Sequence, residues 1–153
     1  MMRHLAVISL TIVATLMLNC QPAIGDDLAD LKAANESLDK ALSAGDVDAI
    51  FEIWQDGAVM IGGAGFPRVT DNASFQPEAK QLLENISLQP SWYKVDYRVV
   101  GDTGLVWGVG IMRITVKATN AVETDYMKIC RVYSKFDGEW KIVMVHTSPI
   151  VLE

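Results

Sequence analysis

A predicted hairpin near the C-terminus constrains this chain most, because a two-residue turn fixes which residues of its two strands pair. The pair Asp137-Gly138 favours the positive φ angles of a primed turn, and it divides the stretch Tyr126–Pro149 into two arms. Both arms are rich in aromatic and β-branched residues, which suit a pleated, packed surface. The sequence therefore predicts a long antiparallel hairpin over Tyr126–Pro149, with Arg131 and His146 as the conspicuous polar residues inside its apolar arms.

The N-terminal residues have the features of a processing signal. Arg3 and His4 precede an apolar run from Leu5 to Leu18, and Ala23-Ile24-Gly25 supplies small residues before a cleavage point. This pattern predicts a signal peptide over residues 1–25 and export to a periplasm or the medium. The alternative is a lipoprotein, anchored through Cys20, and only that alternative gives the protein contact with a membrane.

The remainder, residues 26–153, has the length of one domain with a single core. Loss of Arg3 with the signal changes the formal net charge from −6 to −7. An acidic domain without a basic run argues against nucleic acid as a partner. Only Cys130 and His146 then remain as soft ligands, too few for a tetrahedral zinc cluster, so we expect no metal and no cofactor.

Three helices are expected before the strands, each from apolar spacing and capping residues. The first has leucines at helical spacing and ends at Gly45, the second is capped by Asp46, and the third is capped by Ser74. A short strand and a glycine-rich loop separate the second from the third. The expected helices are Asp27–Ala44, Val47–Trp54 and Ser74–Asn85, and the short strand is Ala58–Ile61.

From residue 91 onward the sequence predicts strands joined by turns, namely Trp92–Val100, Leu105–Lys117 and the two arms of the hairpin. The strand Leu105–Lys117 is apolar on both faces, and one of these faces includes Trp107. An antiparallel strand of this kind must be covered on both sides. Helices can cover one face, so we expect a homodimer in which a partner subunit covers the other.

The order of these elements resembles the nuclear transport factor 2-like superfamily, within it the SnoaL-like and uncharacterised bacterial branches. The resemblance rests on four segments of the sequence. They are Gly45–Ala49, Trp54–Val59, Gly101–Gly104 and Asp137–Val143 followed by His146 and Ser148. The tail is also similar to the association domain of calcium/calmodulin-dependent kinases. The resemblance implies a cone-shaped α+β domain, with three N-terminal helices packed on a curved antiparallel sheet.

The resemblance also implies a conical, largely apolar pocket between the sheet and the helices. Arg131 would hold a carboxylate or carbonyl oxygen there through its guanidinium fork, or it would pair with Asp96 or Asp125 and tie strands together. His146 would be a general acid or base, or a hydrogen-bonded residue at a strand end. The residues expected to touch a ligand are Arg131, His146, Trp54, Met60, Trp107 and Met127.

A superfold of this kind supports several functions. Ketosteroid isomerase-like relatives place a catalytic aspartate just beyond the first strand, where this chain has Ile61-Gly62-Gly63. Without that base, the sequence favours a binding domain for a small apolar or carboxylate-bearing molecule. Two alternatives remain: a cofactor-independent isomerase, dehydratase or cyclase with His146 as the proton shuttle, and a structural oligomerisation domain.

Overall fold

The computed structural model describes residues 24–62 and 68–150. The described chain forms helices α2 (Ile24–Ala44), α3 (Val47–Ile53) and α4 (Asn72–Asn85), and strands β1 (Trp54–Ile61), β2 (Arg68–Val69), β3 (Ile86–Val100), β4 (Thr103–Val116), β5 (Ala121–Phe136) and β6 (Glu139–Pro149). All but the last two residues of the predicted signal peptide lie outside the described ranges, so signal peptide and export stay predictions.

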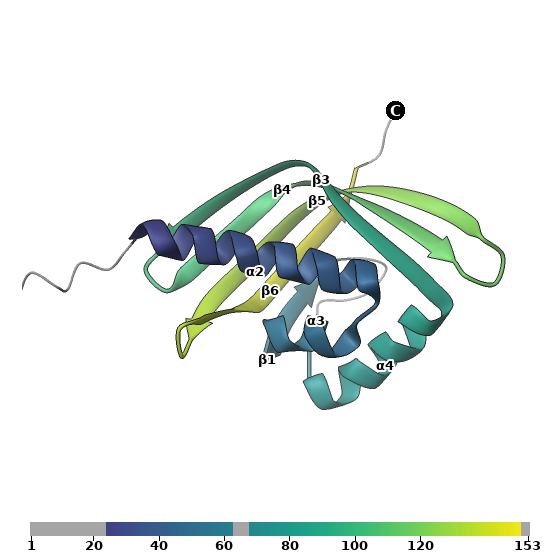
Figure 1. Cartoon of the computed structure of the whole chain (residues 1–153), viewed down its shortest axis with the longest axis horizontal. Helices are drawn as coiled ribbons and strands as arrows, with labels where there is room; N and C mark the ends of the chain where they lie inside the picture. Colours follow the sequence, from purple (N-terminus) through teal and green to yellow (C-terminus); the bar gives the residue numbers. More distant parts are fainter. Residues whose placement is uncertain (1–23, 63–67, 151–153) are drawn as a thin grey trace, which may run out of the picture.

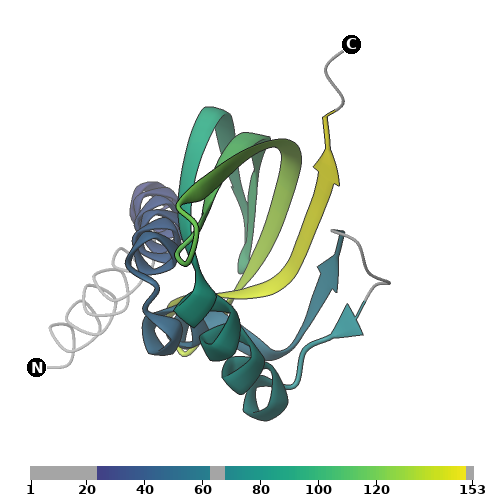
Figure 2. The same cartoon turned by 90° about the vertical axis from the view of Figure 1, so that its right-hand side faces the viewer.

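The strands form one six-stranded sheet in the order β2-β1-β6-β5-β4-β3. Strands β3 to β6 make an antiparallel meander, and α2 crosses its inner face (Figure 1). The sheet is strongly curved and stays open (Figure 2). The predicted α+β cone of three helices on a curved sheet is confirmed. One pairing departs from the antiparallel pattern, because β1 runs parallel to β6; no hairpin joins these two strands, so no local turn sets their direction.

The C-terminal hairpin forms as predicted. Asp137 and Gly138 have φ angles of 51° and 87°, and Phe136 pairs with Glu139 beside the turn. Further along, the register shifts between Val132 and Tyr133. Because side chains alternate between the faces of a sheet, this register decides which residues of β5 and β6 look toward the helices.

Local capping signals were mostly correct. Gly45 ends α2 with a φ of 68°, and the Asp46 carboxylate accepts a hydrogen bond from the Ala49 N–H at 3.1 Å. The prediction that Ser74 caps the third helix is wrong. Asp71 is the cap, because its carboxylate reaches the Ala73 N–H at 3.1 Å, and the Ser74 hydroxyl instead donates to Asp71 at 3.0 Å.

Strand boundaries differ more than helix boundaries. Strand β1 begins at Trp54 rather than Ala58, and β3 begins at Ile86 rather than Trp92. Both extensions are stabilised by pairing with a neighbouring strand, since Trp54 lies opposite Ile142 and Ile86 lies opposite Val116. Such long-range pairing leaves little trace in the local sequence.

The core lies between α2 and the inner face of the meander. The buried apolar residues of α2 pack against fully buried residues of β4, β5 and β6, and Ile50 and Leu83 extend the cluster under α3 and α4. The residues at the centre are Leu31, Leu38, Ala41, Val106, Tyr133, Trp140 and Ile142. This packing holds α2 against the strand that carries Arg131.

Gly108 on β4 is a position where a close backbone approach requires glycine. It lies beside the bulge between Trp92 and Lys94 in β3, and a Cβ atom at Gly108 would collide with the backbone carbonyl oxygen of Lys94. A Cβ at Gly110 would instead meet the end of the Ile129 side chain, which can move.

We therefore expect Gly108→Ala to destabilise the domain more than Gly110→Ala. Overpacking in a well-packed region costs about 1–3 kcal/mol, and Gly108→Ala should lie at the upper end because backbone atoms must shift. Chemical denaturation of the two variants measures the difference. Equal stabilities would show that the bulge yields as readily as a side chain.

Candidate functional site

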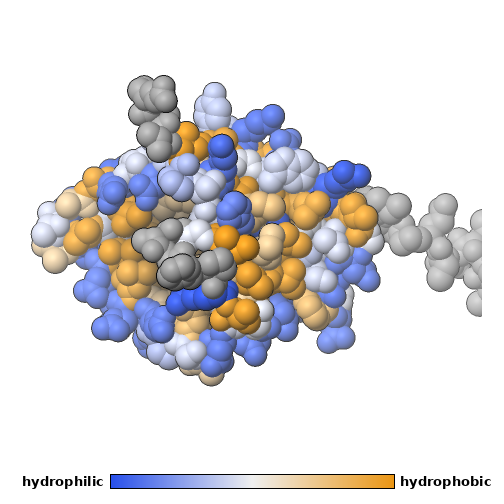
Figure 3. All heavy atoms as spheres, turned by 180° about the vertical axis from the view of Figure 1, so that it is seen from behind, coloured by the Kyte–Doolittle hydropathy of each residue, from blue (hydrophilic) through white to orange (hydrophobic). Residues whose placement is uncertain are grey.

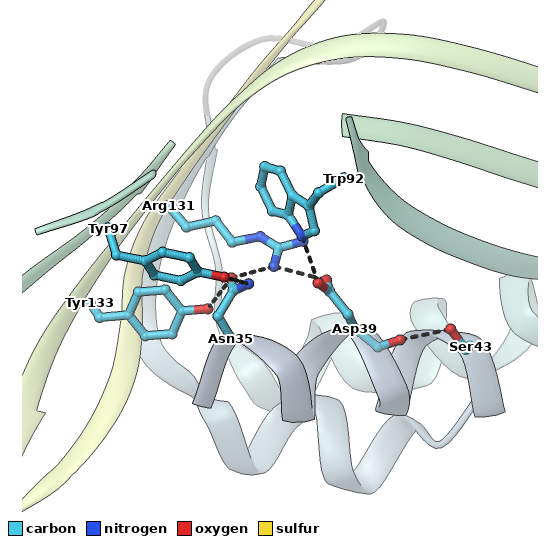
Figure 4. Close-up of polar contacts among 7 residues, drawn as sticks. All are labelled: Asn35, Asp39, Ser43, Trp92, Tyr97, Arg131 and Tyr133. Atoms are coloured by element: carbon cyan, nitrogen blue, oxygen red, sulfur yellow. Dashed lines mark hydrogen bonds and ion pairs between the residues drawn. The ribbon is translucent and has the colours of Figure 1, made fainter. Parts of the chain in front are cut away.

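A buried polar cluster forms around Arg131, which is on β5 and only 5% exposed. Its Nη1 donates a hydrogen bond to Asn35 Oδ1 at 2.6 Å and lies 2.9 Å from Asp39 Oδ1. The second contact is an ion pair without hydrogen-bond geometry, because Asp39 Oδ1 has no hydrogen-bond partner among the described residues. Asn35 and Asp39 lie one turn apart on α2 (Figure 4), so one helix face holds the guanidinium.

Trp92 on β3 completes the arrangement around the ion pair. Its Nε1 donates to Asp39 Oδ2 at 2.8 Å, and its ring centroid lies 5.1 Å from the Arg131 guanidinium carbon. The indole therefore fixes the carboxylate through a hydrogen bond and contacts the cation through its ring. Through Asp39, Trp92 and Arg131, this arrangement joins the elements α2, β3 and β5.

Two tyrosines contact the other side of Asn35. The Tyr133 hydroxyl donates to Asn35 Oδ1 at 3.2 Å, and Asn35 Nδ2 donates to the Tyr97 hydroxyl at 3.4 Å. Burial raises the pKa of the Tyr133 hydroxyl far above its usual range, against the opposing effect of the Arg131 charge. Partial burial raises the pKa of Tyr97 as well. Both phenols therefore stay protonated and neutral at physiological pH.

A pocket of about 300 Å³ lies beside this cluster, between the inner face of the sheet and the helices. Apolar side chains dominate its lining, and Arg131 is the charged residue among the described ones. The lining residues are Leu38, Leu42, Ile50, Trp54, Met60, Gly62, Met112, Met127, Ile129, Arg131, Val145 and Thr147. The pocket thus combines an apolar wall with a single strong hydrogen-bond donor.

Arg131 uses only part of its donor capacity. Both of its polar contacts to Asn35 and Asp39 involve Nη1. Among residues 24–62 and 68–150, Arg131 donates a hydrogen bond to Asn35, and this bond comes from Nη1 rather than from Nε or Nη2. A guanidinium carries five N–H donors, so Arg131 has further donors beyond the one that binds Asn35.

Four of the six predicted ligand-contacting residues line this pocket: Trp54, Met60, Met127 and Arg131. Trp54 is held in place by a hydrogen bond from its Nε1 to Thr70 Oγ1 at 2.9 Å. The structure therefore brings together residues from β1 and β5 that are far apart in the sequence.

The other two, His146 and Trp107, lie on the opposite face of the sheet. They share a cross-strand row with Cys130, which pairs with both of them, whereas Arg131 pairs with Val106 and Val145. The His146 side chain is exposed, and Trp107 is 40% exposed. Hydrophobic residues gather on this face away from α2 (Figure 3). His146 and Arg131 therefore do not share a cavity.

The acidic partner of Arg131 comes from the helix rather than from a strand. Asp96, one of the two candidates from sequence, lies opposite Trp107 in the sheet, and Asp125 lies opposite Met112, away from Arg131. The residues that sequence analysis missed are Asn35 and Asp39. A signal for them existed, because both fall within the stripe of leucines that α2 turns toward the sheet.

Two further findings concern metal ions and membrane-spanning helices. No three His, Cys, Asp or Glu side chains come together to hold a metal ion in the described part of the chain. No helix among the described residues is long and apolar enough to cross a membrane.

Residues 31–152 match the family model of the SnoaL-like domain. The chain belongs to this family. The matched range includes Asn35, Asp39 and Arg131, and it lies within the domain predicted from sequence, residues 26–153. No protein of curated function matches the chain.

Solved structures confirm the nuclear transport factor 2-like fold. A candidate dehydratase of the NTF2-like family from Streptomyces avermitilis is 16% identical with a TM-score of 0.72, covering 84% of this chain and 99% of its own. A ketosteroid isomerase-like protein from Erwinia carotovora atroseptica is 20% identical with a TM-score of 0.63, covering 82% and 98%. The S. rosetta CaMKII hub is 21% identical with a TM-score of 0.64, covering 80% and 96%. At such identities the likeness shows the fold alone.

The ion pair predicts a large effect of one substitution and its relief by a second. Arg131→Met leaves the Asp39 carboxylate, whose side chain is 18% exposed, without its cation, and breaking a buried pair in this way costs about 3–5 kcal/mol. Adding Asp39→Asn removes the stranded charge and keeps an acceptor for Trp92, so the double variant should recover most of the loss.

Urea denaturation of the wild type, both single variants and the double variant measures this coupling. Additive losses in the double variant would contradict a buried pair, and a single Arg131→Met variant as stable as the wild type would do the same.

Proposed function

We propose that this domain binds a small, largely apolar molecule that presents one oxygen atom to Arg131. The observation that carries the proposal is the presence of unused N–H donors on a buried guanidinium beside an apolar pocket. A ligand oxygen would accept hydrogen bonds from these donors, and hydrogen bonds from a charged guanidinium are stronger than those between neutral groups.

The size and lining of the pocket support this proposal. Its volume of about 300 Å³ equals that of about ten water molecules at ~30 Å³ each, which suits a medium-length acyl chain. Three methionines, Met60, Met112 and Met127, contribute to the wall. Methionine side chains adapt to irregular apolar shapes, so the wall tolerates variation in the ligand tail.

Binding is better supported than catalysis. In the enzymatic alternative His146 is the proton shuttle, yet His146 lies on the face of the sheet that points away from the pocket. The described lining contains neither a carboxylate nor an imidazole, and a general base must come within hydrogen-bond reach of the proton it removes.

Filling the pocket should abolish binding while leaving the fold intact. Met127→Trp places a larger side chain in the lining, and we expect the affinity for methyl octanoate or octanoate, whichever the wild type binds, to fall by at least about tenfold, or ~1.4 kcal/mol. Isothermal titration calorimetry measures the change. Leu82→Trp is the control, because Leu82 is 55% exposed on α4 and does not line the pocket, and it should bind as the wild type does.

Failure of the wild type to bind either molecule, together with native mass spectra free of a co-purified apolar ligand, would sink the binding function. An equal loss of affinity in the Met127 and Leu82 variants would show that the loss does not come from filling the pocket.

We also propose that two copies associate through the helix-free face of the sheet. This face exposes Trp107 and Tyr126, each 40% accessible, and exposed apolar patches of this kind often mark interaction sites. The fold similarity to the S. rosetta CaMKII hub is consistent with self-association.

Placing a charge on this face should separate the copies. We expect Trp107→Glu to be monomeric in size-exclusion chromatography with light scattering at micromolar concentration, where the wild type is dimeric. Leu82→Glu is the control, since Leu82 is 55% exposed on α4 rather than on the sheet. A monomeric wild type would refute the dimer.

A further inference from the structure

The charge of Arg131 is already compensated within the protein. Asp39 Oδ1 lies 2.9 Å from Nη1, and the remaining contacts of the cluster come from the neutral side chains of Asn35, Trp92 and Tyr133. Burial keeps the Tyr133 phenol protonated. The cluster as a whole therefore carries no net charge toward the pocket, although Nε and Nη2 of Arg131 remain hydrogen-bond donors.

A carboxylate and a neutral carbonyl group differ sharply in such an environment. A ligand carboxylate would become a second anion beside one cation, and burying an uncompensated charge in an apolar site is expensive. It would also repel Asp39 across the shared guanidinium. A ketone, ester or amide oxygen accepts the same hydrogen bonds without adding charge.

We propose that Asp39 is the specificity-determining residue of the pocket. Because Asp39 neutralises Arg131, the pocket accepts neutral carbonyl compounds and rejects carboxylates of the same chain length. The inference rests on the proposed binding function and narrows the ligand class that the sequence left as apolar or carboxylate-bearing. Asp39 does not line the pocket itself and acts through Arg131.

Other charges near Asp39 do not change this balance. On its outer side Asp39 borders a surface groove of about 550 Å³ together with Glu36 and Lys40. These two residues are exposed and opposite in charge, so solvent screens them. Among the described carboxylates, only Asp39 forms a salt bridge with Arg131. Asp39 therefore neutralises the charge of the guanidinium.

The test compares methyl octanoate with octanoate, which share one acyl chain. Calorimetry on the wild type at about pH 7 should give the ester an affinity at least about tenfold higher than that of octanoate, equal to ~1.4 kcal/mol.

Asp39→Asn keeps an acceptor for Trp92 and leaves the Arg131 charge without its counter-charge. The affinity for octanoate should therefore rise at least about tenfold, while the affinity for the ester should change little. Glu36→Gln removes the same charge from the exposed face of α2 and should leave the preference unchanged.

A second measurement needs no variant, should Asp39→Asn not fold. Lowering the pH toward about 4, the range in which a simple carboxyl group takes up a proton, should strengthen octanoate binding to the wild type, because the neutral acid then forms. Ester binding should stay flat.

Several results would overturn the inference while leaving the binding function standing. They are octanoate binding as tightly as the ester, a preference that survives Asp39→Asn, and octanoate binding that does not respond to pH. If neither compound binds, the proposed function fails and the inference fails with it.

Discussion

A guanidinium buried in the middle of a strand needs partners, and both polar partners of Arg131 come from a single turn of α2. Asn35 and Asp39 reach it from one helix face, and the leucines beside them pack on the same strands. The position of α2 over the sheet is therefore set by two kinds of contact. Apolar packing supplies most of the stability, while the polar contacts allow few alternative positions of the helix, since each displaced partner would be left buried and unsatisfied.

The register of the meander separates the molecule into two faces with different roles. Arg131 pairs with Val106 and Val145 toward the helices, and Cys130 pairs with Trp107 and His146 toward the outside. A shift of one residue would exchange these sets. Because the turn at Asp137-Gly138 and the shift after Val132 fix that register, they also decide that the pocket contains the arginine and lacks the histidine.

Local signals in the sequence predicted the main elements well. Residues such as Gly45, Asp46 and the Asp137-Gly138 pair act on their immediate neighbours, so their effects are visible without a tertiary structure. Ser74 was misjudged because Asp71, three residues earlier, already caps the helix by accepting from the Ala73 N–H, so the helix begins at Asn72 and Ser74 lies in its first turn. Export through residues 1–25 stays a prediction, since all but the last two of these residues lie outside the described ranges.

The sequence by itself determined that Arg131 would be enclosed and would need a partner, because it stands among apolar strand residues. It also determined the α+β order and the resemblance that gave the fold. Only the tertiary structure decided which partner Arg131 has, since Asn35 is 96 positions away and no local pattern links α2 to β5. The same holds for His146, whose face depends on a register shift within the hairpin. The local sequence does not determine which distant residues come into contact; long-range packing does. That packing brings Asp39 to Arg131, so the cation beside the pocket is already neutralised.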